Sequence, residues 1–275
     1  SQPTGLTANI TALALTVSGA TTTNKVYDGT TTATITGGSL VGVVSPDVVT
    51  LTQSGTFSDK NVGTTKTITS TCTISGANAG NYTLTQPTLT ARDITPKALS
   101  ITAPTIVSKV YNGLATSGTV TVGTLSGFIG TETVTTTATG LYSDANVGTG
   151  KSATVTYTLV NGTNGGLATN YSLANGSATG NITAAPLTII GVTANNKIYD
   201  GNTVATLSGT PAYSGLQNGE SFSVTGTPSA TFATATVGSG KAVTVTGYTA
   251  PTANYTVSQP TGLTANITAL ALTVS

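Results

Sequence analysis

The segment SQPTGLTANITALALTVS at residues 1–18 returns, letter for letter, at residues 258–275. Eighteen identical residues in succession do not arise by chance, so the chain is built from a repeating unit. The two copies are offset by 257 residues. Self-similarity on this scale decides the architecture before any single residue is considered, because each repeat must fold in the same way.

Four shorter motifs divide the 257-residue period into three. Each third carries, in the same order, a Lys-x-Tyr-x-Gly motif, a Val-Gly-x-x-Lys motif, an Asn-Tyr pair and an Ile-Thr pair. The copies stand at 25–29, 109–113 and 197–201; at 62–66, 147–151 and 237–241; at 81–82, 170–171 and 254–255; and at 94–95, 182–183 and 267–268. Ending each unit at its Ile-Thr pair predicts repeat 1 at 12–95, repeat 2 at 96–183 and repeat 3 at 184–268. Residues 1–11 are then expected to close a preceding repeat and 269–275 to open a following one.

Composition and periodicity predict an all-β fold. The chain is rich in Thr, Val, Ile and Tyr, which suit pleated strands, and has no Met or Trp. After Lys66, Lys151 and Lys241, apolar residues alternate with Thr and Ser, the pattern of a strand with one face on a core. Gly-rich breaks every 8–12 residues or so are typical of a sandwich. We expect tandem elongated β-sandwich domains, Ig-like or related, joined end to end as a rod.

The residue inventory argues against catalysis, cofactors and nucleic acid. The chain has no His and one Cys, so the usual general base and a zinc site are both missing. The net charge is +1 with scattered basic residues, whereas nucleic-acid binding needs them clustered. No apolar run approaches the ~20 residues that span a bilayer. We therefore expect no enzyme, no cofactor, no metal and no membrane insertion in this segment.

The motif residues are expected to be structural. Asp and Gly tolerate the left-handed backbone of a turn, and Asn can replace Asp there, while the preceding Tyr packs inward with its hydroxyl on a partner. The acidic residues of Asp59–Asn61 and Asp144–Asn146 are expected in turns, calcium being the alternative. Cys72 is expected to be a buried, inert thiol. The repeat-defining positions are Tyr27, Asp28, Gly29, Tyr111, Asn112, Gly113, Tyr199, Asp200, Gly201, Asn81, Tyr82, Asn170, Tyr171, Asn254 and Tyr255.

One chemical alternative is an intramolecular Lys–Asn isopeptide bond beside a buried acid. Burial would lower the lysine pKa and raise that of the acid, which favours attack and proton transfer. The acid recurs at Asp47, Glu132 and Glu220, and a further lysine recurs at Lys25, Lys109 and Lys197. The candidates for the bond itself are Lys66, Lys151, Lys241, Asn81, Asn170 and Asn254. We expect that no such bond forms.

The KVYDG, VGxxK and closing Asn-Tyr motifs resemble the YDG-type repeats of filamentous-haemagglutinin-like and other giant bacterial surface adhesins. The resemblance implies a secreted, extracellular protein of the bacterial cell surface that acts in attachment or biofilm formation. The repeats would be a structural stalk, with adjacent repeats as partners and a host or matrix surface contacted through regions outside this segment.

Two binding functions remain as alternatives. The repeats could themselves bind glycans or host proteins, for which Tyr142, Tyr213 and Tyr248 are the first candidates because they recur least regularly. Ice binding by a flat Thr array is suggested by Thr30–Thr32 and Thr135–Thr137. It would require the same outward ladder in every repeat, and the repeats differ there.

Overall fold

The computed structural model describes residues 2–273, and in this range the chain is all-β, with two single-turn 3₁₀ helices and no α-helix. It forms two compact units. The first contains the chain up to Thr102 together with residues 124–137 and 157–174. The second contains residues 103–123, 138–156 and the chain from Asn175 onward. Repeat 2 thus contributes to both units.

The strands of repeat 1 have at most 6 residues, whereas repeats 2 and 3 also contain strands of 8 to 14 residues. Repeat 1 contains β1 Leu13–Ser18, β2 Thr21–Thr22, β3 Lys25–Val26, β4 Thr32–Ala33, β5 Ile35–Thr36, β6 Ser39–Val41, β7 Thr50–Thr52, β8 Gly55–Phe57, β9 Gly63–Lys66, β10 Ile68–Ser70, β11 Thr73–Ser75, η1 Ala79–Asn81, β12 Tyr82–Leu84 and β13 Arg92–Thr95. Repeat 2 contains β14 Lys97–Ala98, β15 Ser100–Ile101, β16 Thr105–Ile106, β17 Lys109–Val110, β18 Val120–Thr121, β19 Leu125–Ser126, β20 Val134–Tyr142, β21 Gly148–Asn161, η2 Ala168–Asn170, β22 Tyr171–Ser172 and β23 Gly176–Thr183. Repeat 3 contains β24 Ala185–Ala194, β25 Lys197–Ile198, β26 Val204–Ala205, β27 Leu207–Ser214, β28 Thr225–Phe232, β29 Gly238–Thr249, β30 Tyr255–Ser258 and β31 Thr264–Thr268.

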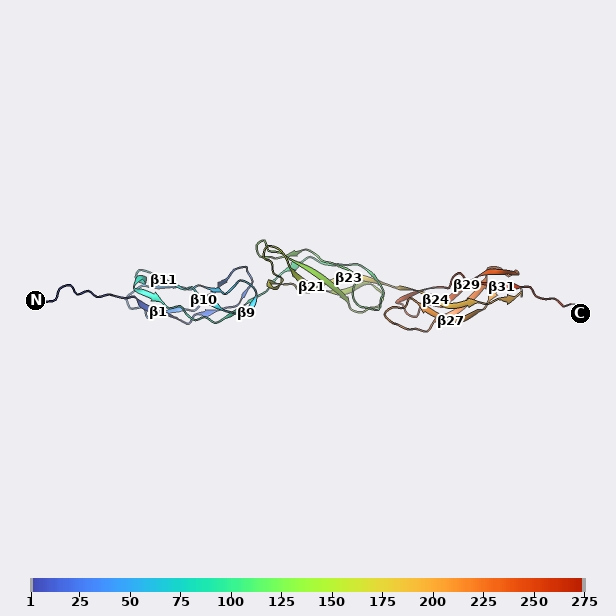
Figure 1. Cartoon of the computed structure of the whole chain (residues 1–275), viewed down its shortest axis with the longest axis horizontal. Coiled ribbons are helices and arrows are strands. Elements are labelled where there is room, and N and C mark those ends of the chain that lie inside the picture. Colours follow the sequence, from blue (N-terminus) through green and yellow to red (C-terminus); the bar gives the residue numbers. More distant parts are fainter. Residues whose placement is uncertain (1, 274–275) are drawn as a thin grey trace. The chain divides into compact units, whose positions relative to one another are not determined.

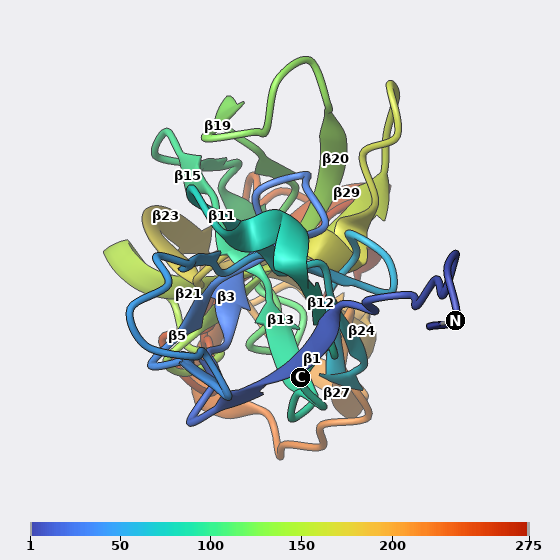
Figure 2. The same ribbon diagram turned by 90° about the vertical axis from the view of Figure 1, so that its left-hand side faces the viewer.

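The strand that opens each repeat pairs in parallel with the strand that starts at the Asn-Tyr tyrosine. Figure 2 shows β1 beside β12, where Leu13 is opposite Tyr82. The equivalent pairs are β14 with β22 and β24 with β30. Because the tyrosine begins the paired strand, its position is fixed relative to the first residues of its own repeat.

The strand that closes each repeat lies between two motif strands. It runs parallel to the strand of the Lys-x-Tyr motif and antiparallel to the Val-Gly-x-x-Lys strand. The isoleucine of the Ile-Thr pair takes part in both ladders and is only 1% exposed at Ile94, Ile182 and Ile267. In Figure 1, β31 and β29 are such a pair in the second unit. Three of the four sequence markers therefore meet in one recurring strand arrangement.

A β-bulge follows each Val-Gly pair. The register shifts between Gly63 and Lys66 and at the equivalent place in β21 and β29. The bulged residue has a left-handed backbone, with φ of 49° at Thr65, 60° at Gly150 and 57° at Gly240. Its N–H donates to a side-chain oxygen of the closing strand, as from Thr65 to Asp93 at 2.7 Å.

Each unit has its own buried cluster of apolar side chains. The first is built around Tyr27, Phe57, Ile94 and Tyr171, and the second around Leu187, Val245 and Ile267 with many neighbours. The expected strand through Cys72 is interrupted, since β10 ends at Ser70 and β11 starts at Thr73, although Cys72 is buried as expected. Its thiol lies near the Ser70 hydroxyl and the Ser54 carbonyl.

The strands expected at the two ends of the chain do not form within the described residues. Residues 2–12 and 269–273 lie outside any strand, and Leu6, Ile10 and Leu272 are 86%, 101% and 89% exposed. In every repeat the closing strand pairs with earlier strands of the same repeat, and the opening strand pairs with later ones. Among the described residues, 2–11 and 269–273 take part in no such pairing.

Candidate functional site

The Lys-x-Tyr-x-Gly motif forms a turn that its own lysine holds together. In repeat 1 the Lys25 ammonium donates to the Asp28 carboxylate at 2.8 Å and to the carbonyls of Thr30 and Thr32. The Asp28 carboxylate also accepts the Thr30 N–H at 2.9 Å, and Gly29 has a φ of +77°. Lys109 and Lys197 do the same at Asn112 and Asp200, where the glycines have φ of +76° and +78°.

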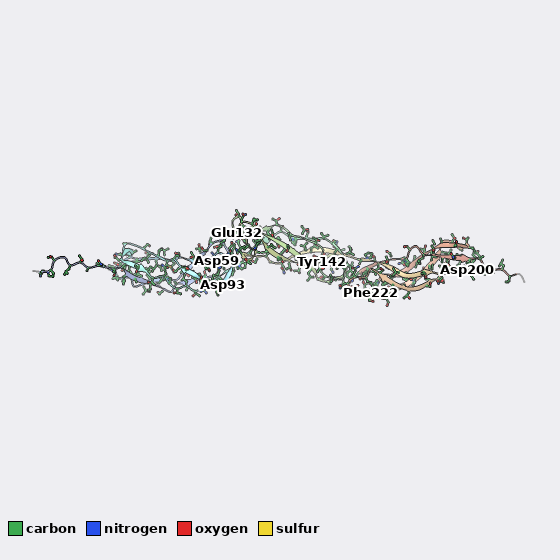
Figure 3. All side chains as sticks on the ribbon, in the orientation of Figure 1. Asp59, Asp93, Glu132, Tyr142, Asp200 and Phe222 are labelled. Atoms are coloured by element: carbon green, nitrogen blue, oxygen red, sulfur yellow. The ribbon has the colours of Figure 1, made fainter. Side chains whose placement is uncertain are left out.

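This turn directs the motif tyrosine toward a carboxylate of the next repeat. The Tyr27 hydroxyl donates to Oε1 of Glu132 at 2.7 Å, and the Tyr171 hydroxyl donates to Oε2 at 2.7 Å. Glu132, labelled in Figure 3, is 7% exposed, and Lys60 lies 3.3 Å from Oε1. The two rings meet edge to face, with centroids 5.5 Å apart. All four residues belong to the first unit.

The second unit contains the same cluster between repeats 2 and 3. The Tyr111 hydroxyl donates to Oε1 of Glu220, and the Tyr255 hydroxyl donates to Oε2 at 2.6 Å. These rings also meet edge to face, with centroids 5.3 Å apart and an interplanar angle of 81°. We call each group of two tyrosines and one carboxylate a Tyr–acid–Tyr cluster. Its recurrence in separate units shows that the motif residues, and not local chance packing, produce it.

The tyrosines and the carboxylate stabilise each other's ordinary charge states. Burial and the hydrogen bond to Glu132 raise the pKa of Tyr27, and the hydrogen bond to Glu220 together with burial raises the pKa of Tyr111 to about 12. Burial alone would raise the pKa of Glu132, but the bonds from Tyr171, Tyr27 and Lys60 outweigh it and lower that pKa. Glu132 is therefore an ionised acceptor of hydrogen bonds and not a proton donor at neutral pH.

A second contact accompanies each Tyr–acid–Tyr cluster. The Asn170 side chain accepts the N–H of Val62 at 2.9 Å and donates to the Asn61 side chain at 3.0 Å, and it is completely buried. In the second unit, Asn254 bonds to Val147 and Asn146 at the same distances. The Asn-Tyr pair of one repeat thus contacts the Lys-x-Tyr-x-Gly motif and the Val-Gly-x-x-Lys motif of the repeat before it.

The lysines considered for a crosslink bond to other partners. Lys66 and Lys151 pair with Asp59 and Asp144 at 2.6 and 2.7 Å, and Lys241 donates to the hydroxyls of Thr234 and Thr236. Within residues 2–273 no hydrogen bond joins any of these lysines to Asn81, Asn170 or Asn254. The Asp59 carboxylate also accepts the Asn61 N–H at 2.8 Å, an Asx turn that shapes the loop for the following repeat.

The outermost copies of the motifs lack one side of the cluster. Tyr27 and Tyr111 are 1% and 5% exposed, but Tyr199 is 42% exposed. The expectation that every motif tyrosine packs inward is therefore wrong for Tyr199, because Tyr27 and Tyr111 each meet the carboxylate of the repeat after their own and no such carboxylate follows repeat 3 among the described residues. At the other end, Tyr82 donates to Asp47 at 2.7 Å without a second tyrosine among the described residues.

The tyrosines proposed for glycan binding do not offer an exposed ring. Tyr142, Tyr213 and Tyr248 are 2%, 8% and 6% exposed, so they belong to the core. The Thr30 hydroxyl donates to the Asp28 carboxylate and accepts from the Lys25 ammonium at the motif turn. Among residues 2–273 no group of three His, Cys, Asp or Glu side chains could hold a metal ion.

Comparison with protein families gives three matches to the YDG domain, at residues 11–90, 95–179 and 183–262. The chain belongs to the YDG domain family. The three matches follow the three repeats closely, and each contains one copy of the Tyr-x-Gly turn and of the Asn-Tyr pair. No curated protein and no solved structure gave a significant match. Across residues 2–273, no helix is both long and apolar enough to cross a membrane.

The sequence identified the residues of the cluster as recurring positions but did not predict that their side chains meet. It assigned Glu132 and Glu220 to a possible crosslink, whereas they accept hydrogen bonds from tyrosines of two repeats. One signal was available. The chain contains only these two glutamates, and both stand at the same place in their repeats.

Proposed function

We propose that these YDG domains are structural stalk repeats of a secreted bacterial surface adhesin, which project an adhesive region for attachment or biofilm formation. The supporting observation is the Tyr–acid–Tyr cluster, which recurs between repeats 1 and 2 and between repeats 2 and 3. A spacer requires a standard joint that each repeat can make with the next. The cluster has that property, because one repeat supplies a tyrosine and the next supplies the carboxylate and the second tyrosine.

The chemistry of the joint suits a mechanical role better than a catalytic one. Both oxygens of Glu132 accept hydrogen bonds, and its negative charge is stabilised by the two phenols and by Lys60. Glu132 is also 7% exposed, so a substrate has little access to its carboxylate as a proton acceptor. The buried polar groups also require their partners, since an unpaired buried carboxylate is costly. This requirement would resist bending or slipping at the joint.

We further propose that the repeats are sandwich-like domains arranged as a rod. Small-angle scattering of the 275-residue chain should then give a longest dimension on the order of 110 Å, from three domains with strands of about ten residues at ~3.3 Å each. A compact particle with a radius of gyration near ~19 Å would refute the rod.

The joint can be tested separately from the rod. The double substitution Glu132→Gln and Glu220→Gln should broaden the scattering-derived distance distribution, because the repeats would hinge at both joints. The matched control is Asp47→Asn, which changes a carboxylate that accepts one tyrosine. Stalk function is then tested by displaying the chain between a membrane anchor and a binding tip on bacteria. Tip access to an immobilised ligand should fall when the stalk carries the double substitution, and unchanged access would contradict the proposal.

Glycan or host-protein binding by the repeats has less support, because its three candidate tyrosines are buried. Binding of the isolated chain to a glycan array would favour that alternative.

A further inference from the structure

Consecutive repeats are connected by a single residue. The closing strand β23 ends at Thr183 and the opening strand β24 starts at Ala185, so only Ala184 lies between them. Between repeats 1 and 2, only Pro96 separates β13 from β14. A pulling force along the chain therefore passes from one strand directly into the next. How a repeat responds to that force depends on how its opening and closing strands are paired.

The opening strand of repeat 3 is bonded to a strand on each side. Figure 1 shows β24 beside β27, with which it forms an antiparallel pair, and its other neighbour is β30. It runs parallel to β30 from Ala185, opposite Tyr255, to Thr188, opposite Ser258. The Ala185 N–H donates to the Asn254 carbonyl at 2.9 Å, at the point where the chain enters the strand. Pulling on this end therefore loads bonds to two strands.

The closing strand of repeat 3 is bonded in the same way. β31 lies between β25, to which it is parallel, and β29, to which it is antiparallel. Ile267 is opposite Lys197 in the first pair and opposite Gly238 in the second. The Thr268 carbonyl, where the chain leaves the strand, accepts the Tyr199 N–H at 2.8 Å. Both ends of the repeat are therefore held by strand pairs on two sides.

The parallel pairs determine the direction in which tension acts on these bonds. β24 starts at Ala185, beside Tyr255, and the chain continues to Lys197, beside Ile267, so β24 runs from the entry of the repeat toward its exit. Tension therefore pulls β24 backward along its own axis and β31 forward. Hydrogen bonds between strands lie across that axis, so they are sheared together. An antiparallel pair pulled apart at one end instead opens one bond after another.

We propose that each repeat is a mechanical clamp, in which tension along the chain shears the opening and closing strands against their partners and the folded repeat resists extension. The pairing recurs in the other repeats. The opening strands β1 and β14 are parallel to β12 and β22, and the closing strands β13 and β23 are parallel to β3 and β17. This property goes beyond the stalk proposal and does not depend on it, because it follows from the pairing within each repeat.

Single-molecule force spectroscopy of the full chain tests the clamp with two pairs of attachment points in repeat 3. The shear pair, Ala184→Cys and Thr268→Cys, pulls β24 and β31 along their axes. The unzipping pair, Thr225→Cys and Thr249→Cys, separates β28 from β29 at one end, where these residues are opposite each other. Cys72, a buried thiol of the first unit, is replaced by Ala in both chains.

The two pairs should differ in force and in the length of chain released. At one loading rate, the shear pair should rupture at a force at least about twofold higher, because forced unfolding follows the unfolding barrier and the sheared bonds must break together. Complete extension should release a contour length of about 290 Å between the shear pair and about 80 Å between the unzipping pair, at ~3.5 Å per residue. These lengths identify the segment that opens.

Two proline substitutions separate the clamp from general stability. Ala185→Pro removes the N–H that bonds to Asn254, and Ala233→Pro removes the N–H that bonds to the Ala242 carbonyl at 3.0 Å between β28 and β29. Position 185 suits proline, because the residue before Pro186 is already restricted to an extended backbone. Ala185→Pro should lower the rupture force of the shear pair, whereas Ala233→Pro should leave it unchanged even if both lower the thermal stability.

Equal rupture forces for the two pairs, or a loss of force with Ala233→Pro as large as that with Ala185→Pro, would overturn the proposal. If Ala185→Pro does not fold, the two attachment pairs still decide, because neither changes a residue of β24 or β30. Failure of the clamp would leave the stalk proposal intact, since that proposal rests on the joints between repeats.

Discussion

Replacing Glu132 with Gln should destabilise the first unit far more than its conservative chemistry suggests. Glu132 accepts one phenol hydrogen on each oxygen, at 2.7 Å in both cases. Glutamine keeps one acceptor oxygen and places an NH₂ group toward the other tyrosine. Tyr171 already accepts the N–H of Ile129, so it cannot simply reverse its hydroxyl to receive a second donor. One buried phenol hydrogen is left without an acceptor.

The magnitude follows from the burial of the site. A buried donor or acceptor without a partner costs about 1–3 kcal/mol, and a hydrogen bond to a charged group is worth about 1.5–3 kcal/mol. Because these two effects overlap, we expect the free energy of unfolding of the first unit to fall by about 2–4 kcal/mol. For a unit of this size, that corresponds to a fall in Tm on the order of 10 °C.

Calorimetry with a double-mutant cycle provides the assay. Glu132→Gln should lower the transition of the first unit, whereas Glu220→Gln should lower that of the second. Tyr27→Phe combined with Glu132→Gln should cost clearly less than the sum of the single changes, because both remove the same hydrogen bond. Asp47→Asn, at a carboxylate that accepts a single tyrosine, should change stability by under about 1 kcal/mol. A Glu132→Gln effect as small as that of Asp47→Asn, or strictly additive single changes, would refute the reasoning.

Four further predictions concern single sites. Folding lowers the pKa of Glu132, so its contribution to stability is present above the ordinary glutamate pKa and is lost as the pH falls through the lowered value; acid titration of the first unit should show this loss, and Glu132→Gln should remove it. Folding raises the pKa of Tyr111 from 10.0 to about 12, so its contribution is present below pH 10 and should disappear between pH 10 and 12 when unfolding of the second unit is measured. Tyr142→Phe should leave the stability of the second unit unchanged or raise it by about 1 kcal/mol in urea unfolding, because the Tyr142 hydroxyl is buried without a partner among the described residues, whereas Tyr213→Phe should destabilise because that hydroxyl accepts the Thr225 N–H at 3.1 Å. Thr65→Gly should stabilise the first unit by about 0.5–1 kcal/mol because Thr65 has φ of 49° where the other repeats have glycine, and Gly150→Thr should have the opposite sign.

The sequence was sufficient for the features that each repeat determines by itself. Composition and alternation predicted an all-β chain, and the structure has only strands and two 3₁₀ turns within residues 2–273. The repeat markers lie on the same paired strands in each repeat, with Ile94, Ile182 and Ile267 buried at equivalent points. The turn chemistry of Asp28 and Gly29 was also recognisable, because a short polar side chain followed by glycine has few other uses.

The joints were not predictable in the same way, because periodicity hides the difference between contacts within a repeat and contacts between repeats. A tyrosine that recurs once per repeat can reach a partner in its own repeat or in the next one, and the sequence spacing is equally regular in both cases. Tyr27 and Glu132 are 105 residues apart, which exceeds the length of one repeat. The structure distinguishes these cases. Tyr27 and Tyr111, which are followed by another repeat among the described residues, are buried, whereas Tyr199 is exposed.

Buried carboxylates at the joints also explain how a chain with so few charges can join its repeats in one register. Only 6% of the residues are charged, so most of each repeat's surface cannot discriminate between partners by electrostatics. Apolar contact alone is non-directional and tolerates sliding. Placing Glu132 in the joint changes this, because any other register would leave a buried charge without its two phenol donors. The same argument applies to Asn170, which is fully buried and bonds to the Val62 backbone and to Asn61. Each joint therefore combines apolar burial, which supplies attraction, with a small set of polar groups that accept only the correct neighbour.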